Sequence, residues 1–335
     1  MVPLGSAPIP WLKPLSWLYG LGASGKNACY RLGLCRARSL PVPVVSVGNL
    51  SAGGTGKTPM VAWLLERYRE AGLRVGVLAR GYGRQDGEIV NDEGRLLALR
   101  FEGLPQRQSP DRHAAGLQLL GEYELDLILL DDGFQHRRLH RDLDLCLLDA
   151  VDPFRGGLLP SGWLREPHSP LARADARLAT GSQAISAAPL RDFPLPRPGL
   201  AHDNPLFFAE TRVRDLVHRP SGDVLPLDSL RGERVFLLAG IARPERFAET
   251  VESLGAEVVG HRWLADHGSF SSAELSSWSR SASEARARFV LTEKDESRAR
   301  IAPTAGPDRL VLRIDLHFDA APPLDLLIPD GIEER

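Results

Sequence analysis

A glycine-rich loop between an apolar run and an amphipathic segment is the feature that most restricts the fold of this chain. Residues 45–59 read VSVGNLSAGGTGKTP. The apolar residues 41–47 predict a buried strand. Residues 57–71 predict a helix with Pro59 in its first turn, where the missing N–H of proline costs nothing. A strand, a glycine loop and a helix in this order are typical of phosphate-binding P-loops. The sequence therefore predicts a nucleotide-binding α/β domain.

The expected chemistry of this loop follows from its backbone. Glycines let successive N–H groups turn inward, and the following helix adds its positive end, so the loop can hold polyphosphate. We expect Lys57 to reach the β- and γ-phosphates of ATP and the Thr58 hydroxyl to bind Mg²⁺. Ser51 stands where the common pattern has glycine. A chance glycine-rich turn is the alternative, which the flanking strand and helix disfavour. The expected nucleotide contacts are Ser51, Ala52, Gly53, Gly54, Thr55, Gly56, Lys57 and Thr58.

A second apolar run ends in two carboxylates. Residues 127–132 read LILLDD. A P-loop needs a carboxylate at the end of a neighbouring strand to complete the magnesium shell, so Asp131 and Asp132 are candidate metal ligands. A solvated strand end is the alternative for this run taken alone. The next residues, GFQHRR, place His136 and two arginines beside the expected metal. Such a cluster suits phosphate or sugar recognition.

The rest of the chain predicts a fold of the α/β class with two domains. Its 335 residues and hydrophobic fraction of 43% suit a globular protein of that size. We expect a P-loop NTPase-like, mostly parallel sheet covered by helices, and a second, smaller α/β domain joined to it by a β-hairpin linker. The supporting β-rich runs are residues 74–78, 125–130, 143–148, 235–240, 289–292 and 310–314, with a helix at 244–254 and a hairpin over 206–227.

The expected domain boundaries follow these patterns and a shift to Pro, Gly and Asp near residue 187. They are an N-terminal membrane-interface helical segment at 1–40, a P-loop kinase domain at 41–186, a β-rich linker at 187–232, a smaller α/β domain at 233–320 and a tail at 321–335.

The N-terminal segment has the pattern of an amphipathic helix. On a helix over residues 11–28, Lys13, Ser16, Gly20, Ser24 and Asn27 share one narrow face. Most of the remaining surface is apolar, and basic residues follow closely. This combination predicts a helix that lies in an anionic membrane surface. Packing of the same helix on its own domain is the alternative. The apolar residues are Trp11, Leu15, Trp17, Leu18, Tyr19 and Leu21, and the basic ones are Lys26, Arg31, Arg36 and Arg38.

Composition restricts the cellular compartment and the classes of binding partner that we expect. A net charge of −2 gives no global attraction to nucleic acid. Cys29, Cys35 and Cys146 are widely spread and lack metal-ligand spacing, which suits a reducing compartment. The N-terminus lacks the basic start of a secretory signal, and no apolar run has the length needed to cross a bilayer. We therefore expect a protein on the cytoplasmic side, with no evident obligate protein partner.

The sequence resembles one family, the tetraacyldisaccharide 4'-kinases of lipid A synthesis, over residues 11–314. The combination of a GN-x4-GG-x-GKTP loop with DDGFQH directly after an apolar strand is the most specific part. The resemblance rests on PVPVVSVGNLSAGGTGKTP, LARGYGR (78–84), DDGFQHRRLHRDLDLCLLDA (131–150), LREP (164–167), AGIARPERF (239–247), DHGSF (266–270) and LTEKD (291–295).

The resemblance implies an activity, a place and a set of site residues. The enzyme would transfer the γ-phosphate of ATP, with Mg²⁺, to the 4'-hydroxyl of a tetraacylated glucosamine disaccharide 1-phosphate and so form lipid IVA. It would work at the cytoplasmic face of the inner membrane, with its site in the cleft between the domains. Asp92 would be the catalytic base, assisted by His267, with Lys57 as a further catalytic residue. Glu93 would be a metal ligand. The residues matched to the acceptor side are Arg80, Arg112, His136, Arg165 and Glu166.

One detail of this sequence departs from the family motif. Asn91 and Gly94 replace the Gly and Pro that flank the acids in the family motif.

Two other functions are alternatives to a kinase. A P-loop switch that gates a partner at the membrane would share the loop and the paired aspartates. The guanine-reading NKxD motif that would favour such a switch is missing from the first domain. A membrane-bound lipid-binding module without chemistry would leave Asp92, Asp131 and Asp132 unexplained.

Overall fold

The computed structural model describes most of the chain and divides it into two compact units. Unit 1 comprises Met1–Gly83, Leu104–Thr211 and Leu316–Arg335, and unit 2 comprises Arg84–Gly103 and Arg212–Asp315. The described residues are 9–52, 55–82, 90–181, 205–241, 244–265, 268, 270–299 and 304–332.

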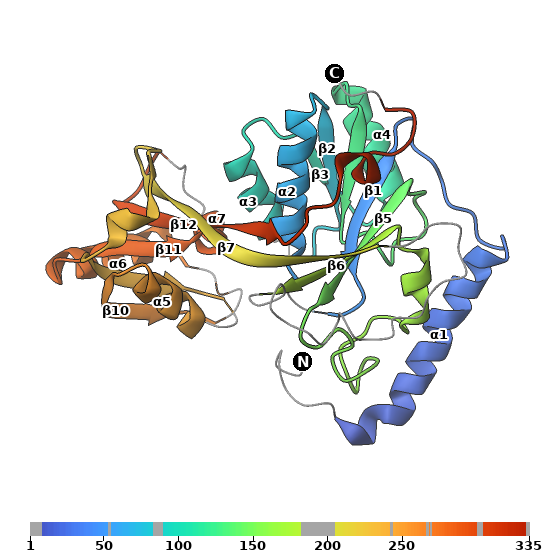
Figure 1. The fold of residues 1–335 in the computed structure, drawn as a ribbon, viewed down its shortest axis with the longest axis horizontal. Coiled ribbons are helices and arrows are strands. Elements are labelled where there is room, and N and C mark those ends of the chain that lie inside the picture. Colours follow the sequence, from blue (N-terminus) through green and yellow to red (C-terminus); the bar gives the residue numbers. More distant parts are fainter. Residues whose placement is uncertain are drawn as a thin grey trace. The chain divides into compact units, whose positions relative to one another are not determined.

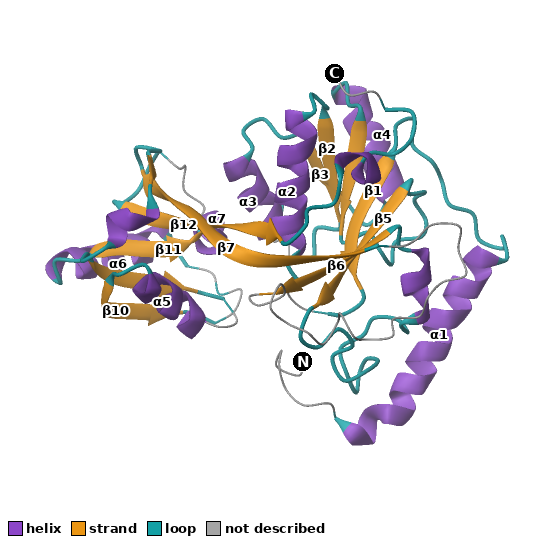
Figure 2. Ribbon diagram, in the orientation of Figure 1, coloured by secondary structure: helices purple, strands orange, loops and turns teal. Residues whose placement is uncertain are grey.

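Unit 1 is built on a parallel sheet (Figures 1 and 2). Its strands lie in the order β7-β6-β5-β1-β4-β2-β3, and every pairing in this series is parallel. The central strand β1 is buried at all six positions, as expected for a strand covered on both faces. The bounds are β1 Val44–Asn49, β2 Val75–Ala79, β3 Gln106–Gln108, β4 Leu127–Asp131, β5 Leu143–Asp149, β6 Ala176–Gly181 and β7 Leu206–Arg219.

The helix that follows the glycine loop packs on this sheet through an apolar face. Helix α2 (Lys57–Glu70) follows the glycine loop and buries Leu64, Leu65 and Tyr68. The Tyr68 hydroxyl donates to the Leu327 carbonyl at 2.6 Å, which ties α2 to the C-terminal helix α8 (Leu324–Leu327). The remaining helices are α1 (Lys13–Arg31), α4 (Arg112–Glu122) and the 3₁₀ segments Pro10–Leu12 and Ser169–Arg173.

Unit 2 is a smaller α/β body. Strands β10, β9, β11 and β12 lie side by side in that order with parallel pairing. Strand β7 starts in unit 1 and ends in unit 2, where it forms an antiparallel hairpin with β8 by pairing Leu216 with Leu225. The predicted hairpin is therefore confirmed. The bounds are β8 Val224–Leu225, β9 Arg234–Ala239, β10 Glu257–Trp263, β11 Arg288–Thr292, β12 Arg309–Phe318, α3 Asp92–Arg100, α5 Pro244–Ser253, α6 Ser272–Glu284, α7 Glu293–Arg298 and a 3₁₀ turn Leu227–Leu230.

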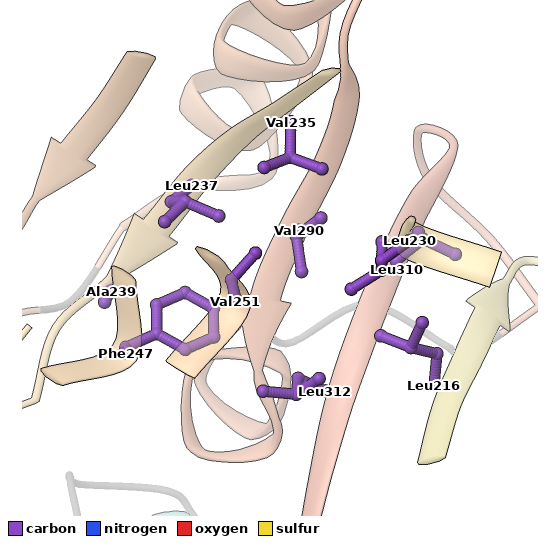
Figure 3. Packing of buried hydrophobic residues seen from close by; sticks show 10 residues of the cluster. All are labelled: Leu216, Leu230, Val235, Leu237, Ala239, Phe247, Val251, Val290, Leu310 and Leu312. Carbon is purple, nitrogen blue, oxygen red and sulfur yellow. The ribbon is translucent and has the colours of Figure 1, made fainter. Parts of the chain in front are cut away.

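A compact apolar cluster holds unit 2 together (Figure 3). Side chains from β9, β11 and β12 meet Phe247 and Val251 of helix α5 and Leu230 of the 3₁₀ turn. All of these positions are buried, so this unit has a core of its own.

Helix α3 lies in unit 2, although the sequence pattern grouped its residues with the P-loop domain. Arg95 of α3 donates to the Ser297 carbonyl of α7, at 2.9 Å. Arg100 pairs with Asp315 and donates to the Ile314 carbonyl, at 3.1 Å. Partners more than 200 positions away in the sequence thus decide where this helix belongs.

Candidate active site

The glycine loop is fixed at both ends by contacts within unit 1. The amide N–H of Ala52 donates to the Trp163 carbonyl at 2.7 Å. Asn49, the last residue of β1, donates from Nδ2 to the Thr55 hydroxyl at 2.6 Å, and Thr180 of β6 donates to the Thr55 carbonyl at 2.6 Å. Gly56 has a φ of 76°, in the left-handed region that favours glycine. Helix α2 therefore starts from a fixed turn.

The predicted nucleotide contacts mostly lie in the described part of this loop. Ser51 and Thr55 are buried, and Lys57 and Thr58 occupy the first turn of α2. Gly53 and Gly54 lie outside the described residues.

The paired aspartates end the strand next to the loop. Strands β1 and β4 are neighbours, with Val47 opposite Asp131, so parallel pairing brings both carboxyl ends to one edge of the sheet. Asp131 is buried, whereas Asp132 turns out of the strand with a φ of 52°. Lys57 Nζ lies 3.6 Å from Asp132 Oδ1, and Arg165 Nη1 donates to both Asp132 oxygens at 2.8 and 2.9 Å.

This arrangement sets the charge state of Asp132. Burial alone raises the pKa of the Asp132 carboxyl, but the positive charges of Lys57 and Arg165 outweigh it, and the net direction is downward. Asp132 is thus an anion at neutral pH, held between two cations.

The same residues fit a magnesium ion. Mg²⁺ prefers oxygen ligands and is commonly bound through one or two carboxylates together with phosphate oxygens and water. Asp131 and Asp132, at the end of β4, and the Thr58 hydroxyl, in the first turn of α2, are oxygen donors of this kind. Among the described residues no three His, Cys, Asp or Glu side chains converge into a metal-binding group. Binding of Mg²⁺ with a nucleotide does not require one.

A second cationic group lies beside the aspartates. Arg112 begins helix α4 and is only 5% exposed. Its Nη1 lies 3.0 Å from His136 Nδ1, and the charges of Arg80, Asp131 and Asp132 all act on it. Burial and the Arg112 charge lower the pKa of His136 to about 4, so its ring is neutral at pH 7. A neutral ring accepts from Arg112 at Nδ1 and keeps its proton on Nε2. Arg80 is exposed.

Glu166 occupies a buried hub of hydrogen bonds. Its Oε1 accepts from Gln135 Nε2 at 2.9 Å and from Arg173 Nη2 at 2.8 Å, and its Oε2 accepts from Asn27 at 2.9 Å. Gln135 also donates to the Asn49 carbonyl at 2.8 Å. Both oxygens of Glu166 therefore accept hydrogen bonds from side chains of this protein. The expected direct contact of Glu166 with the acceptor stays a prediction.

Several residues of this hub were not singled out from the sequence. Asn49, Gln135 and Arg173 are the clearest cases. The only signal in the sequence was that Asn49 and Gln135 stand inside the GN and DDGFQH motifs. Arg173 carried no such signal, because its partners Glu166 and the Phe134 carbonyl are set by folding.

Helix α1 places Ser16 and Gly20 of its narrow polar face against the rest of unit 1, whereas Lys13 and Ser24 of that face are exposed. The Ser16 hydroxyl donates to the Leu158 carbonyl at 3.0 Å and accepts from the Ser161 amide at 3.0 Å. A Cβ on Gly20 would lie 2.7 Å from Leu158 Cδ1, so this face packs closely.

The opposite face of α1 and its 3₁₀ entry turn is apolar and exposed. Trp11 is 78% exposed, Trp17 72% and Leu21 69%, and Leu15 and Leu18 are exposed as well. Figure 1 shows α1 at the periphery of unit 1, away from α2 and α4. No helix in the described part of the chain is both long and apolar enough to span a bilayer.

Unit 2 carries the acids expected from the NDEG motif. Asn91 caps α3 by accepting from the Gly94 amide at 3.0 Å, and Asp92 and Glu93 follow in the first turn. Asp92 accepts from Arg95 at 2.8 Å and from the buried Arg298 at 3.2 Å. His267 lies outside the described residues.

Arg298 is itself held by the LTEKD segment. Asp295 is fully buried, accepts from the Gly240 amide at 3.0 Å and lies 3.2 Å from Arg298 Nη1. Thr292 caps α7 by accepting from the Asp295 amide at 3.2 Å. The motif thus orients one of the two arginines that contact Asp92.

A parallel sheet, a glycine loop after its central strand and paired aspartates after the adjacent strand define the class of P-loop nucleotide-binding proteins. The family model for LpxK, tetraacyldisaccharide-1-P 4'-kinase, matches residues 9–330. The chain belongs to this family.

Individual relatives agree with the family model. The chain is 40% identical over 317 residues to a tetraacyldisaccharide 4'-kinase of Anaeromyxobacter sp. (strain Fw109-5), covering 89% of this chain and 84% of the relative. It is 37% identical over 310 residues to the protein of that name from Pseudomonas aeruginosa, covering 88% and 86%.

A solved structure is similar in fold. The crystal structure of LpxK from Aquifex aeolicus in complex with ATP matches with a TM-score of 0.71 and 27% identity, over 92% of this chain and 95% of that one. The predicted family, α/β fold class and kinase activity are confirmed.

Proposed function

We propose that this protein transfers the γ-phosphate of ATP to the 4'-hydroxyl of a tetraacylated glucosamine disaccharide 1-phosphate. The observation that carries the proposal is the convergence of Lys57 and Arg165 on Asp132, at the end of the strand next to the glycine loop. Phosphoryl transfer depends mainly on positioning and on stabilising the charge of the transferred group, and this site gathers the charges that such chemistry needs.

The residues of unit 1 then divide the work on the nucleotide. The loop amides from Ser51 to Thr58 hold the phosphate chain, and Lys57 neutralises the β- and γ-phosphates. Bound Mg²⁺ would neutralise charge on the phosphate oxygens, held by Thr58, Asp131 and Asp132. Asp132, which lies 3.6 Å from Lys57 Nζ, would also be one of the carboxylates that hold the cation. Glu93 is a further candidate ligand.

The acceptor needs cations and a base. Arg80, Arg112 and Arg165 supply guanidinium groups that can form bidentate contacts with phosphate oxygens. A neutral His136 can donate from Nε2 to an acceptor oxygen. Asp92 takes the proton of the attacking 4'-hydroxyl, since a sugar hydroxyl is a poor acid and needs a carboxylate within hydrogen-bond reach. His267 would assist this base.

The substrate also requires a membrane, and α1 suits that surface. Each CH₂ group moved from lipid into water costs about 0.8 kcal/mol, so a tetraacylated sugar does not leave the bilayer and the enzyme must come to it. The exposed face of α1 carries indole and leucine side chains, and Arg31 and Arg36 follow for anionic headgroups. We propose that α1 docks on the cytoplasmic face of the inner membrane.

One assay tests the activity. Purified protein, ATP and Mg²⁺ are incubated with the acylated disaccharide 1-phosphate, and the bis-phosphorylated product is measured by mass spectrometry. Product formation that needs all components supports the proposal. Hydrolysis of ATP without any transfer would instead favour the nucleotide switch.

A second assay tests the membrane surface. A triple change of Trp11, Leu15 and Leu18 to serine should weaken binding to anionic liposomes and raise the apparent KM for the lipid, with the KM for ATP unchanged. Thermal unfolding should match wild type, because these side chains are exposed. Liposome binding equal to wild type would contradict the docking role of α1.

A further inference from the structure

We infer that α1 is also part of the catalytic machinery, with Tyr19 and Asn27 as positioning residues for phosphoryl transfer. This inference rests on the proposed function. It assigns two tasks to one helix. The exposed apolar side chains bind lipid, whereas the buried side of Asn27 and the hydroxyl of Tyr19, a residue that is 40% exposed, hold the segments that carry Gln135 and Arg165.

The first link runs from Tyr19 to the metal-site aspartate. The Tyr19 hydroxyl donates to the Arg165 carbonyl at 2.7 Å. The Arg165 amide donates to the Leu50 carbonyl at 2.8 Å, so the same residue is also tied to the start of the glycine loop. Its side chain pairs with both oxygens of Asp132. The backbone position of Arg165 therefore sets where this guanidinium meets the site, and Tyr19 holds that backbone from the membrane side.

The second link runs from Asn27 to the end of β1. Asn27 donates to Glu166, which accepts from Gln135 through its other oxygen, and Gln135 donates to the Asn49 carbonyl. Lys26 adds a direct contact by donating to the Gln135 carbonyl at 3.0 Å. Gln135 directly precedes His136, and Asn49 Oδ1 lies 3.4 Å from Lys57 Nζ. A shift of Asn27 would thus reach His136, through Gln135, and Asn49, the residue beside Lys57.

The helix can do this because its inner face is held at fixed points. Ser16 donates to the Leu158 carbonyl, and a Cβ on Gly20 would lie 2.7 Å from Leu158 Cδ1, so a larger residue at Gly20 would require this leucine side chain to move. Asn27 faces Glu166, which is only 3% exposed, so its amide satisfies a buried carboxylate without adding charge. These contacts explain why the helix presents the small and polar residues Ser16, Gly20 and Asn27 inward.

The test separates the two tasks of the helix by substitution. Tyr19→Phe removes one hydroxyl, Asn27→Ala removes the donor, and Asn27→Asp puts a second carboxylate against Glu166. Ser24→Ala is the matched control, because Ser24 is an exposed α1 residue. For each protein we would measure kcat, both KM values, binding to anionic liposomes and thermal unfolding.

The expected result is a loss in kcat without a loss of membrane binding. Misplacement of catalytic groups by about 1 Å can cost up to roughly a hundredfold in rate, so a fall in kcat of roughly tenfold is expected for Tyr19→Phe and Asn27→Ala. Asn27→Asp should fall further, because like charges repel in a buried site. Liposome binding and Ser24→Ala should match wild type.

Two outcomes would overturn the inference. Wild-type kcat in folded Tyr19→Phe and Asn27→Ala would show that α1 only anchors the protein. A rise in the lipid KM together with weaker liposome binding, at unchanged kcat, would assign both residues to docking. Absence of transfer by the wild-type protein would instead refute the proposed function, and this inference with it.

Discussion

Replacing Gly48 with alanine should destabilise the protein and disturb the site in one step. Gly48 is the fifth residue of β1, and a Cβ added to it would lie 2.6 Å from both the amide nitrogen and the Cβ of Phe134. Phe134 is fully buried, in the loop that joins Asp132 to Gln135. Because the clash involves backbone and Cβ atoms, no rotamer of Phe134 relieves it. The loop itself must move.

The magnitude follows from two opposing effects. Gly48 is not in the left-handed region, so alanine is allowed there and stiffens the unfolded chain, which stabilises by about 0.4–1 kcal/mol. Forcing an extra methyl into a packed site costs about 1–3 kcal/mol. Contacts under 3.0 Å require something to shift, so we expect the steric cost to win. The free energy of unfolding should fall by about 1–2 kcal/mol.

Urea unfolding followed by circular dichroism would measure this change, and kcat should fall as well because the moved loop carries His136. Gly121→Ala is the matched control. Gly121 lies in helix α4, where an added methyl would meet no atom within 4 Å, and alanine there should stabilise by up to about 1 kcal/mol. An unfolding midpoint for Gly48→Ala at or above that of wild type would refute the steric reasoning.

Three further predictions concern single side chains. Lys57→Ala and Asp132→Ala should each abolish turnover by removing phosphate and metal contacts, and near-normal kcat in either protein would contradict the kinase site. Asp92→Asn should keep ATP affinity while kcat collapses, with a smaller fall for His267→Ala, whereas lost ATP binding would move Asp92 to the nucleotide site. The His136 pKa is lowered to about 4 from 6.5, so the unfolded chain binds a proton that the folded chain does not between these values. Stability should therefore fall as the pH drops from about 6.5 toward about 4, and in His136→Gln this part of the pH dependence should be absent.

Much of unit 1 could be predicted from the sequence because its signals are local. The strand, glycine loop and helix around Lys57 are contiguous, and so are the apolar residues before Asp131. Parallel pairing then places both ends at one edge of the sheet without further information. The observed β1, α2 and β4 lie where the pattern predicted them, and the family motifs are contained in these same segments.

The amphipathic pattern of α1 was equally visible, but its orientation was not. The sequence left open whether the apolar face packs on the protein or is exposed. Folding decides this, because the Leu158 carbonyl and the Ser161 amide form hydrogen bonds with Ser16, and Gly20 lets the helix approach the Leu158 side chain closely.

Tertiary structure alone decided the unit to which Asp92 belongs and the partners of Glu166. Arg298 lies 206 positions from Asp92, and Asn27 lies 139 positions from Glu166. Contacts of this kind join segments that carry no shared periodicity or spacing. The sequence by itself determined the chemistry that the loop and the paired aspartates can perform, since that chemistry depends on residue types within a few positions. The orientation of those groups depends on hydrogen bonds between distant segments, which exist only once the sheet and its surrounding helices have formed.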